Sequence, residues 1–338
     1  MRKQYWLSIS VSLAFGAGAL WLVLPSAFSQ GSLNTLRGLH GYHYAALGAA
    51  VLGWWAAAGL RFKLLARTVG QPLRFHQGVR VTLAGIFAAT VTPSGGGSSV
   101  GTVLGLTRYG LSTSQAVAVT TLNLTLDLVF FTWALPASFL YLSAAGVRLP
   151  GGNLSFVVTG LSLGLLGVGY LVTFRLDLLG RGLKKLLFLA PLRPIRRRLL
   201  RFLNELELAH TLFSARGGGV RLGFHLLTAL VWGFHLALLN VVAWALALGV
   251  APVELLALHL LVLTVSFTIP TPGGSGYLDA ALSLVLKGDA PAQTVSVAVL
   301  LWRVFGYYLY FVVCPLSSFA LLLRRPGRRA PHPNPPGR

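Results

Sequence analysis

The chain has 338 residues, of which 55% are hydrophobic and only 10% are charged, and its mean hydropathy is +0.72. Soluble domains carry about 25% charged residues, so this composition excludes an ordinary soluble protein and indicates that lipid surrounds most of the chain. The net charge of +21 comes from basic residues that lie between the apolar segments. That distribution is typical of cytoplasmic loops in a membrane protein and predicts no nucleic-acid partner.

Six apolar segments are long enough to cross about 30 Å of hydrocarbon as helices. The first is longer than the apolar part of a signal peptide, which has about 7–15 residues, so we expect an uncleaved helix. The six segments are Tyr5–Phe28, Tyr42–Leu60, Ser114–Leu142, Asn153–Phe174, Leu222–Leu248 and Ala292–Leu323.

Two further apolar regions, 81–110 and 252–288, are each interrupted by proline and glycine. The interruptions read Thr92-Pro93-Ser94-Gly95-Gly96-Gly97 and Pro270-Thr271-Pro272-Gly273-Gly274-Ser275-Gly276. Such residues end a helix, and open backbone at membrane depth is tolerated only inside protein or beside a water-filled cavity. The helical pieces on either side are about half a bilayer long. Both regions are therefore predicted to be re-entrant helical hairpins, each entering and leaving on one side.

The basic residues orient this layout. With a cytoplasmic N-terminus, 24 of the 28 basic residues fall on the cytoplasmic side, and only Arg37, Arg148 and Lys287 fall outside. Arg303 is then the one basic residue within a span. We expect both termini and the basic connector 175–221 to face the cytoplasm of a cell (inner) membrane. Residues 1–324 form one transmembrane domain, and the basic, proline-rich tail 325–338 is expected to be disordered.

A weak internal repeat relates the two hairpins. Thr92-Pro93 recurs as Thr271-Pro272, and residues 114–119 are echoed by residues 292–297, at offsets of 179 and 178 residues. Three crossings separate the hairpins, so they enter from opposite sides and form an inverted pair. A chance match in a sequence rich in alanine, valine and glycine is the alternative.

Charged side chains inside lipid cost at least about 2.5–3.5 kcal/mol each, so those within spans need an explanation. Asp127 lies midway along the third span, and Arg303 lies about eleven residues into the last span. Counted from opposite membrane faces, both reach the midplane, and we expect them to be partners. The pair either holds two helices together or lines the path of a substrate. Asp279 either caps the helix after the second glycine loop or belongs to the site.

The glycine loops place the N-termini of two half-helices near mid-membrane, where they attract phosphate or carboxylate. Broken helices at matching positions of two inverted halves are typical of a transporter site, although the glycines could instead permit close helix packing. No metal-ligand spacing, phosphate-binding NTPase loop or cofactor motif is present. The predicted substrate-binding residues are Pro93, Gly95, Gly96, Gly97, Asn123, Asp127, Pro272, Gly273, Gly274, Gly276, Asp279 and Arg303.

These motifs resemble the flippase-like transmembrane domain of the lysylphosphatidylglycerol synthase/flippase family, over essentially the whole chain. The residues that carry the resemblance are Thr92-Pro93, Gly97, Arg108-Tyr109-Gly110-Leu111-Ser112, Asp127, Pro270 to Gly276, Asp279 and Leu301-Trp302-Arg303. The resemblance implies movement of a lipid or lipid-linked head group between leaflets. The family often has Gly-Glu and a following Arg where Ser98-Ser99 and Thr102 stand here. The soluble aminoacyl-transferring domain of its bifunctional members is not expected.

The sequence thus predicts an all-α polytopic membrane protein with about six full transmembrane helices and two inverted re-entrant helical hairpins. Its expected function is that of a flippase or transporter for an anionic phospholipid or lipid-linked head group, without enzymatic activity and without a cofactor. A non-transporting membrane scaffold is one alternative. An intramembrane serine hydrolase with Ser275 as nucleophile is another, although no histidine follows Ser275 until His332.

Overall fold

The computed structural model describes residues 30–90, 92, 95–147, 217–269, 271, 273–287 and 290–314, with isolated positions between 163 and 211. Four helices in these ranges are long and apolar enough to cross a membrane. They are α3 (Gly41–Thr68), α6 (Thr113–Ala144), α10 (Gly218–Ala245), and α13 (Ala292–Arg303), which continues through the π-helix η2 (Val304–Tyr308) to Cys314. Helices long and apolar enough to span a membrane therefore lie at four of the six predicted spans. The predicted spans 5–28 and 153–174 lie outside the continuously described residues.

Local sequence explains where α6 begins. Ser112 and Gln115 form a capping box, in which the Ser112 hydroxyl accepts from the Gln115 N–H and the Gln115 side chain accepts from the Ser112 N–H. Apolar residues are then found on every side of the helix, and large ones such as Trp133 and Leu140 are exposed. A helix that is apolar all round is buried in protein or in a membrane. This pattern agrees with lipid contact along α6.

Two pairs of short helices occupy the two interrupted regions. In the first region α4 (Phe75–Thr90) is followed by α5 (Ser98–Arg108), and in the second α11 (Pro252–Ser266) is followed by α12 (Tyr277–Lys287). Helices α4 and α5 pack antiparallel at very short range, because Gly101 lies against the Ala84 carbonyl and Gly105 lies against Val81. A side chain at Gly101 would collide with that carbonyl, so glycine is what allows this close approach.

The helix boundaries of the two halves match. Ser98 and Tyr277 start the two 11-residue helices, Arg108 and Lys287 end them, and Thr113 and Ala292 start the next long helices, always 179 residues apart. The loops match too, since the Gly95 N–H donates to the Thr92 carbonyl and the Gly274 N–H donates to the Thr271 carbonyl. Gly95 and Gly274 both have positive φ, +68° and +64°, which favours glycine at each.

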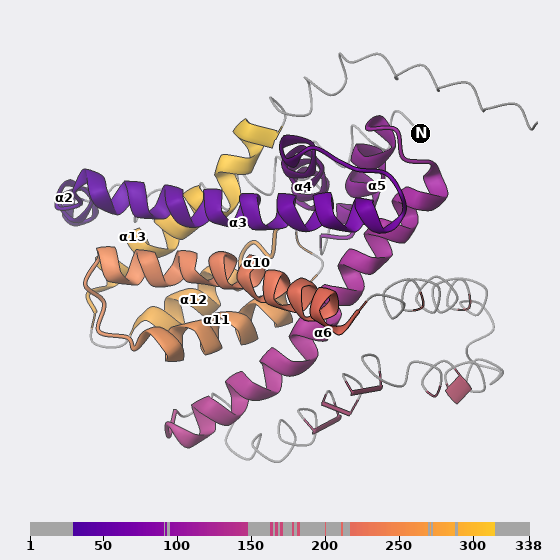
Figure 1. The fold of residues 1–338 in the computed structure, drawn as a ribbon. Helices are drawn as coiled ribbons and strands as arrows, with labels where there is room; N and C mark the ends of the chain where they lie inside the picture. The colour runs from indigo at the N-terminus through magenta and orange to yellow at the C-terminus, as the bar shows by residue number, and fades with distance from the viewer. Residues whose placement is uncertain are drawn as a thin grey trace, which may run out of the picture.

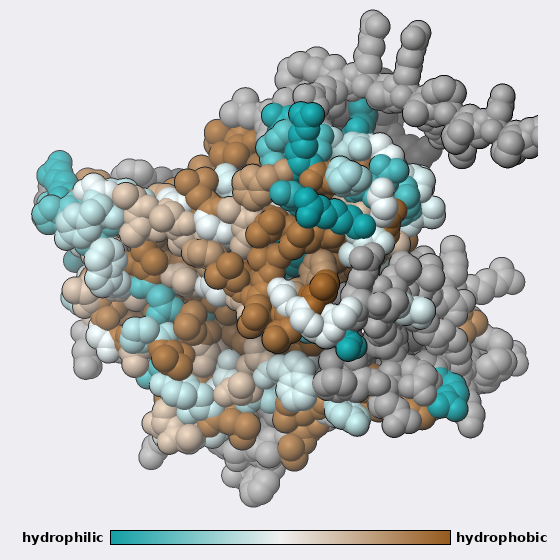
Figure 2. Space-filling model, viewed as in Figure 1, coloured by the Kyte–Doolittle hydropathy of each residue, from teal (hydrophilic) through white to brown (hydrophobic). Residues whose placement is uncertain are grey.

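Helices α3 and α10 pack side by side and run in opposite directions (Figure 1). The start of α3 meets the end of α10 through Tyr42 and Trp244, and Arg61, near the end of α3, bonds Thr228 near the start of α10. Hydrophobic residues gather over these two helices in the middle of the face shown in Figure 2. Hydrophilic residues lie at the α2 end (Gln30–Arg37) and over the α4–α5 end. An apolar middle with polar ends is the surface expected of a chain that crosses a bilayer.

Candidate functional site

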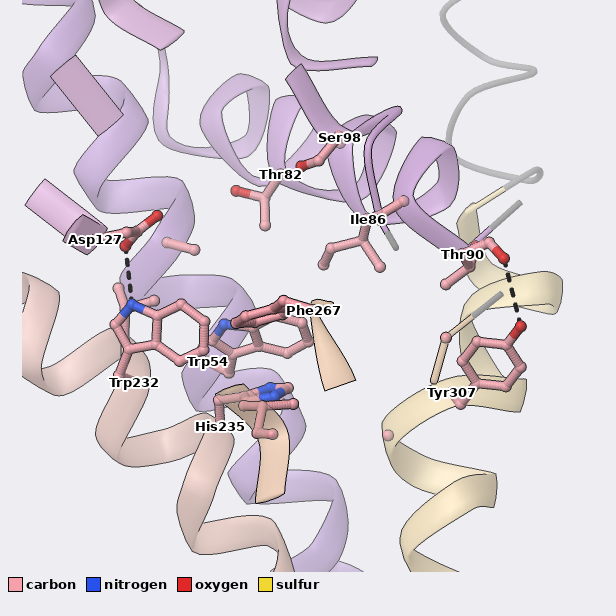
Figure 3. Close-up of a pocket in the computed structure, with 18 of the residues that line it drawn as sticks. Trp54, Thr82, Ile86, Thr90, Ser98, Asp127, Trp232, His235, Phe267 and Tyr307 are labelled. Carbon is pink, nitrogen blue, oxygen red and sulfur yellow. Dashed lines mark hydrogen bonds between the residues drawn. The ribbon is translucent and has the colours of Figure 1, made fainter. Parts of the chain in front are cut away.

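A cavity of about 480 Å³ lies where the two pairs of short helices meet the long helices. Residues from α3, α4, α5, α6, α10, α11, α12, α13 and η2 line it, as do residues of the loops before α5 and α12. Much of the wall is aromatic, and Figure 3 shows Trp54, Trp232, Phe267 and Tyr307 around it. The polar lining residues are Arg61, Thr82, Thr90, Ser98, Thr102, Asn123, Asp127, His235, Ser266 and Arg303.

Asp127 sits at the centre of one polar cluster. Its Oδ1 accepts from Arg61 Nη1 at 2.7 Å and from Trp232 Nε1 at 2.9 Å. Its Oδ2 accepts from Arg61 Nη2 and from Asn123 Nδ2, both at 3.3 Å. Arg61 also donates to the Thr228 hydroxyl at 3.2 Å, and its side chain is only 4% exposed. This cluster ties α3, α6 and α10 together beside the cavity.

Arg303 forms a second cluster with Asp279. Its Nε donates to Asp279 Oδ1 at 2.6 Å, its Nη2 donates to Oδ2 at 2.9 Å, and its Nη1 donates to the Gly273 carbonyl at 3.0 Å. Asp279 Oδ2 also accepts from the Gly276 N–H at 2.9 Å, which caps the first turn of α12. Asp279 therefore caps the helix and pairs with Arg303 at once, and the pair holds the second loop against α13.

The predicted pairing of Asp127 with Arg303 is wrong. Each of the two residues has a different partner, because α3 does not end at Leu60 but continues to Thr68 and carries Arg61 into the protein. The predicted end of the second span at Leu60 leaves Arg61 among the 24 cytoplasmic basic residues, with Arg303 as the only basic residue within a span. The structure places both arginines inside apolar helices, each against its own carboxylate. Arg303 pairs with the α11–α12 region that immediately precedes it in the chain, through Asp279 and the Gly273 carbonyl.

Tyr307 connects the two short-helix pairs. Its hydroxyl donates to the Thr90 carbonyl, at the end of α4, over 3.4 Å (Figure 3). Its ring lies directly against Gly273, where a Cβ atom would come within 2.1 Å of the ring. Gly273 also has φ +57°, so both space and backbone conformation require glycine there. Tyr307 belongs to η2, and a π-helical turn within a longer helix is frequently found at functional sites.

The structure brings about half of the predicted site residues together. Those that line the cavity are Gly95, Asn123, Asp127, Gly273, Gly274 and Arg303, while Gly96, Gly97, Gly276 and Asp279 do not line it. Gly97 has a packing role, since a Cβ atom there would lie 2.5 Å from the Ala88 carbonyl oxygen. Pro93 and Pro272 lie outside the described residues.

Sequence reasoning missed Arg61, Trp54, Trp232 and Tyr307. A signal existed for Arg61, because Phe62, Leu64 and Leu65 continue the apolar pattern beyond it. Nothing in the sequence distinguished the lining tryptophans from those that face outward. In the part of the chain that the structure describes, no group of three or more His, Cys, Asp or Glu residues could hold a metal ion.

Comparison with known proteins relates this chain to a family of membrane proteins. The family described as the lysylphosphatidylglycerol synthase TM region matches residues 7–314 of this chain, a range that includes the predicted span 153–174 and nearly all of the predicted span 5–28. A UPF0104 membrane protein of Archaeoglobus fulgidus is 25% identical over 265 residues, which covers 76% of this chain and 80% of that protein. The matched range spans both short-helix pairs and both charged clusters.

Proposed function

Since the chain belongs to the family of the lysylphosphatidylglycerol synthase TM region, we propose that it is a flippase-like transporter for a membrane lipid. The lipid's head group would pass through the cavity between the two short-helix pairs while the acyl chains remain in the bilayer. The proposal includes a cell-membrane location with both termini in the cytoplasm. It involves no covalent step and hence no enzymatic activity.

The observation that carries the proposal is the cavity itself. It is lined by Arg61, Asn123 and Asp127, which lie in helices that are otherwise mainly apolar. Burying charged and polar groups in such helices is costly, so their presence there indicates a functional role. A head group needs polar partners on its way across the membrane, and these three side chains would supply them. Transporters commonly bind substrates where two broken helices meet. Here the loops before α5 and α12 both contribute to the wall, through Gly95, Gly273 and Gly274.

The matching helix boundaries support an inverted repeat. Helices α3 and α10 occupy corresponding positions, each before its pair of short helices, and they run antiparallel, as expected if one half is inserted upside down relative to the other. In that arrangement the α4–α5 and α11–α12 pairs would be re-entrant hairpins that enter from opposite sides. Rocking of one half against the other would then open the cavity alternately to each leaflet.

A phosphate-bearing, anionic head group is the proposed cargo. The first turn of α5 contributes Ser98 to the cavity wall, and helix N-termini attract phosphate through their dipole and backbone N–H groups. The family description names the membrane region of a phospholipid synthase, which also supports a phospholipid substrate.

The test is leaflet exchange of fluorescent phosphatidylglycerol in proteoliposomes. The wild type should accelerate exchange. Ala89 lines the cavity, so Ala89→Phe should block the cavity with its ring and abolish exchange. Ala137→Phe adds the same side chain at an exposed position of α6 and should leave exchange unchanged. Exchange no faster than in empty liposomes, with several anionic phospholipids tried, would favour the scaffold alternative instead. Labelling of Ser275 by a reactive-serine probe would favour the hydrolase.

A further inference from the structure

His235 is a titratable residue in the cavity wall whose ring nitrogens have no partner. It lies in the middle third of α10, with its ring centroid 4.6 Å from the ring of Trp54 and 5.6 Å from that of Trp232 (Figure 3). The side chain is half-buried, and its ring nitrogens make no hydrogen bond to another described residue yet remain accessible. A ligand in the cavity can therefore reach this imidazole.

The other charged groups of the cavity wall are already paired. Arg61 is paired with Asp127, and Arg303 is paired with a carboxylate of α12. The remaining titratable group of the wall is the phenol of Tyr307, which is neutral at physiological pH. With His235 uncharged, the wall therefore has no net charge. His235 is the lining residue that can gain a charge near neutral pH without breaking an ion pair.

A second histidine lies against His235 on the side away from the cavity. His259 of α11 stacks on His235 with ring centroids 6.4 Å apart, and it is 0% exposed. Its Nδ1 lies 3.3 Å from the Leu236 carbonyl, and its ring packs against Trp302. Because His259 does not line the cavity, a proton that arrives with a ligand reaches His235 first. Two like charges at this distance repel, so the pair takes up one proton rather than two.

An anionic head group brings one negative charge into a cavity whose wall has no net charge. An isolated charge is costly at membrane depth, and a neighbouring opposite charge lowers that cost. A proton on His235 supplies this opposite charge. The anion in turn makes a charged imidazole less costly among the rings of Trp54 and Trp232. The coupling is reciprocal, so the proton and the anion each raise the affinity of the cavity for the other.

We infer that His235 is a proton-binding site, and that one proton crosses the membrane with each singly charged anionic head group. The proton binds a ring nitrogen of His235 from the water on the side where the lipid enters. It returns to water on the side where the lipid leaves, so the two cross together without net charge. A proton gradient then drives the lipid from one leaflet to the other. This inference rests on the proposed function, because it names what drives the transporter.

Proton binding is measured in detergent, separately from transport. A charged imidazole quenches the fluorescence of an adjacent indole, so Trp54 and Trp232 report the charge of His235. Tryptophan fluorescence is recorded between pH 5 and pH 8, the range in which histidine ordinarily titrates, in micelles with phosphatidylglycerol or with zwitterionic phosphatidylcholine. With phosphatidylglycerol the quenching should move to higher pH by about one unit or more, which is a tenfold coupling of ordinary size.

Three variants show where the proton binds. The shift should be absent in His235→Gln, whose amide takes up no proton in this range. It should also be lost in Ala89→Phe, which blocks the cavity, because the shift requires the anion to enter and not merely a charged micelle. His43→Gln is the matched control, since it removes the contact of another histidine with a tryptophan, Trp244, and does not change the cavity wall.

Transport is measured as the distribution of fluorescent phosphatidylglycerol between the leaflets of proteoliposomes that carry a pH gradient of one unit. One proton per lipid predicts about tenfold accumulation in the leaflet on the alkaline side, because a tenfold proton ratio then balances a tenfold lipid ratio. Phosphatidylcholine, which has no net charge, should not accumulate. His235→Gln should lose the accumulation and His43→Gln should keep it. Thermal unfolding checks that each variant folds, and His235→Asn replaces His235→Gln if the latter does not.

The outcomes separate this inference from the proposed function. Exchange of phosphatidylglycerol that ignores the pH gradient would overturn proton coupling and retain the transporter. A lipid-dependent fluorescence shift that disappears in His235→Gln, without exchange of any lipid, would retain the proton site and overturn transport. Accumulation that survives in His235→Gln would overturn the assignment to His235. A shift that is lost in His259→Gln but kept in His235→Gln would overturn it as well, because it would place the proton on His259.

Discussion

Replacing Asp127 by asparagine should destabilise the protein strongly, because it leaves Arg61 charged without a countercharge. The Arg61 side chain is 4% exposed, and its only carboxylate contact among the described residues is Asp127. Removing one member of a buried ion pair costs about 3–5 kcal/mol. Asparagine keeps the size of the side chain and the acceptor for Trp232, so most of this cost comes from the lost charge.

A double-mutant cycle identifies the partner. Arg61→Gln alone should also lose about 3–5 kcal/mol, since it leaves Asp127 unpaired. The double variant Asp127→Asn/Arg61→Gln contains neither charge and should be much more stable than the sum of the two losses indicates. In a second cycle, Asp127→Asn combined with Arg303→Gln should be additive within about 0.5 kcal/mol, because the two residues share no partner.

The assay is equilibrium unfolding of each purified variant in mixed micelles with increasing denaturing detergent. Strong coupling between Asp127 and Arg61, together with additivity between Asp127 and Arg303, is the expected result. The opposite pattern would refute the pairing seen in the structure and restore the one predicted from the sequence. Additivity in both cycles would mean that neither arginine stabilises Asp127.

Three further outcomes are expected. Gly273→Ala should cost at least about 1–3 kcal/mol of stability in the same unfolding assay, because its Cβ would overlap the Tyr307 ring; a neutral result would mean that the ring does not occupy this place. Arg303→Lys should lose about 1.5–3 kcal/mol, since an ammonium cannot make the paired contacts of the guanidinium with Asp279; wild-type stability would show those contacts to be dispensable. A cysteine at Asn34 should react with an impermeant thiol reagent in intact cells, and one at Gln71 should react only after lysis. Both residues are exposed, so the reverse pattern would invert the proposed topology.

The positions of the helices could be predicted because they depend on local properties of the chain. Apolar length sets where a helix can cross a membrane, and proline followed by glycines stops a helix wherever it occurs. The break at Thr92 to Gly97 and the 11-residue helix after the second glycine loop were therefore visible in the sequence. The offset of 179 residues between matching helix boundaries was visible as well, because the Thr-Pro pair that ends a helix recurs at that distance.

The partners of the buried charges were decided only by the tertiary structure. Asp127 and Arg303 lie at similar predicted depths, but depth does not determine which helices are neighbours or which faces they turn to each other. Arg61 illustrates the difference. The hydropathy boundary at Leu60 placed it beyond the end of the predicted span, whereas the packing of α3 against α6 and α10 buries it against Asp127. Ion pairing acts over a few ångströms between residues 66 positions apart in the chain, so only the assembled helices determine it.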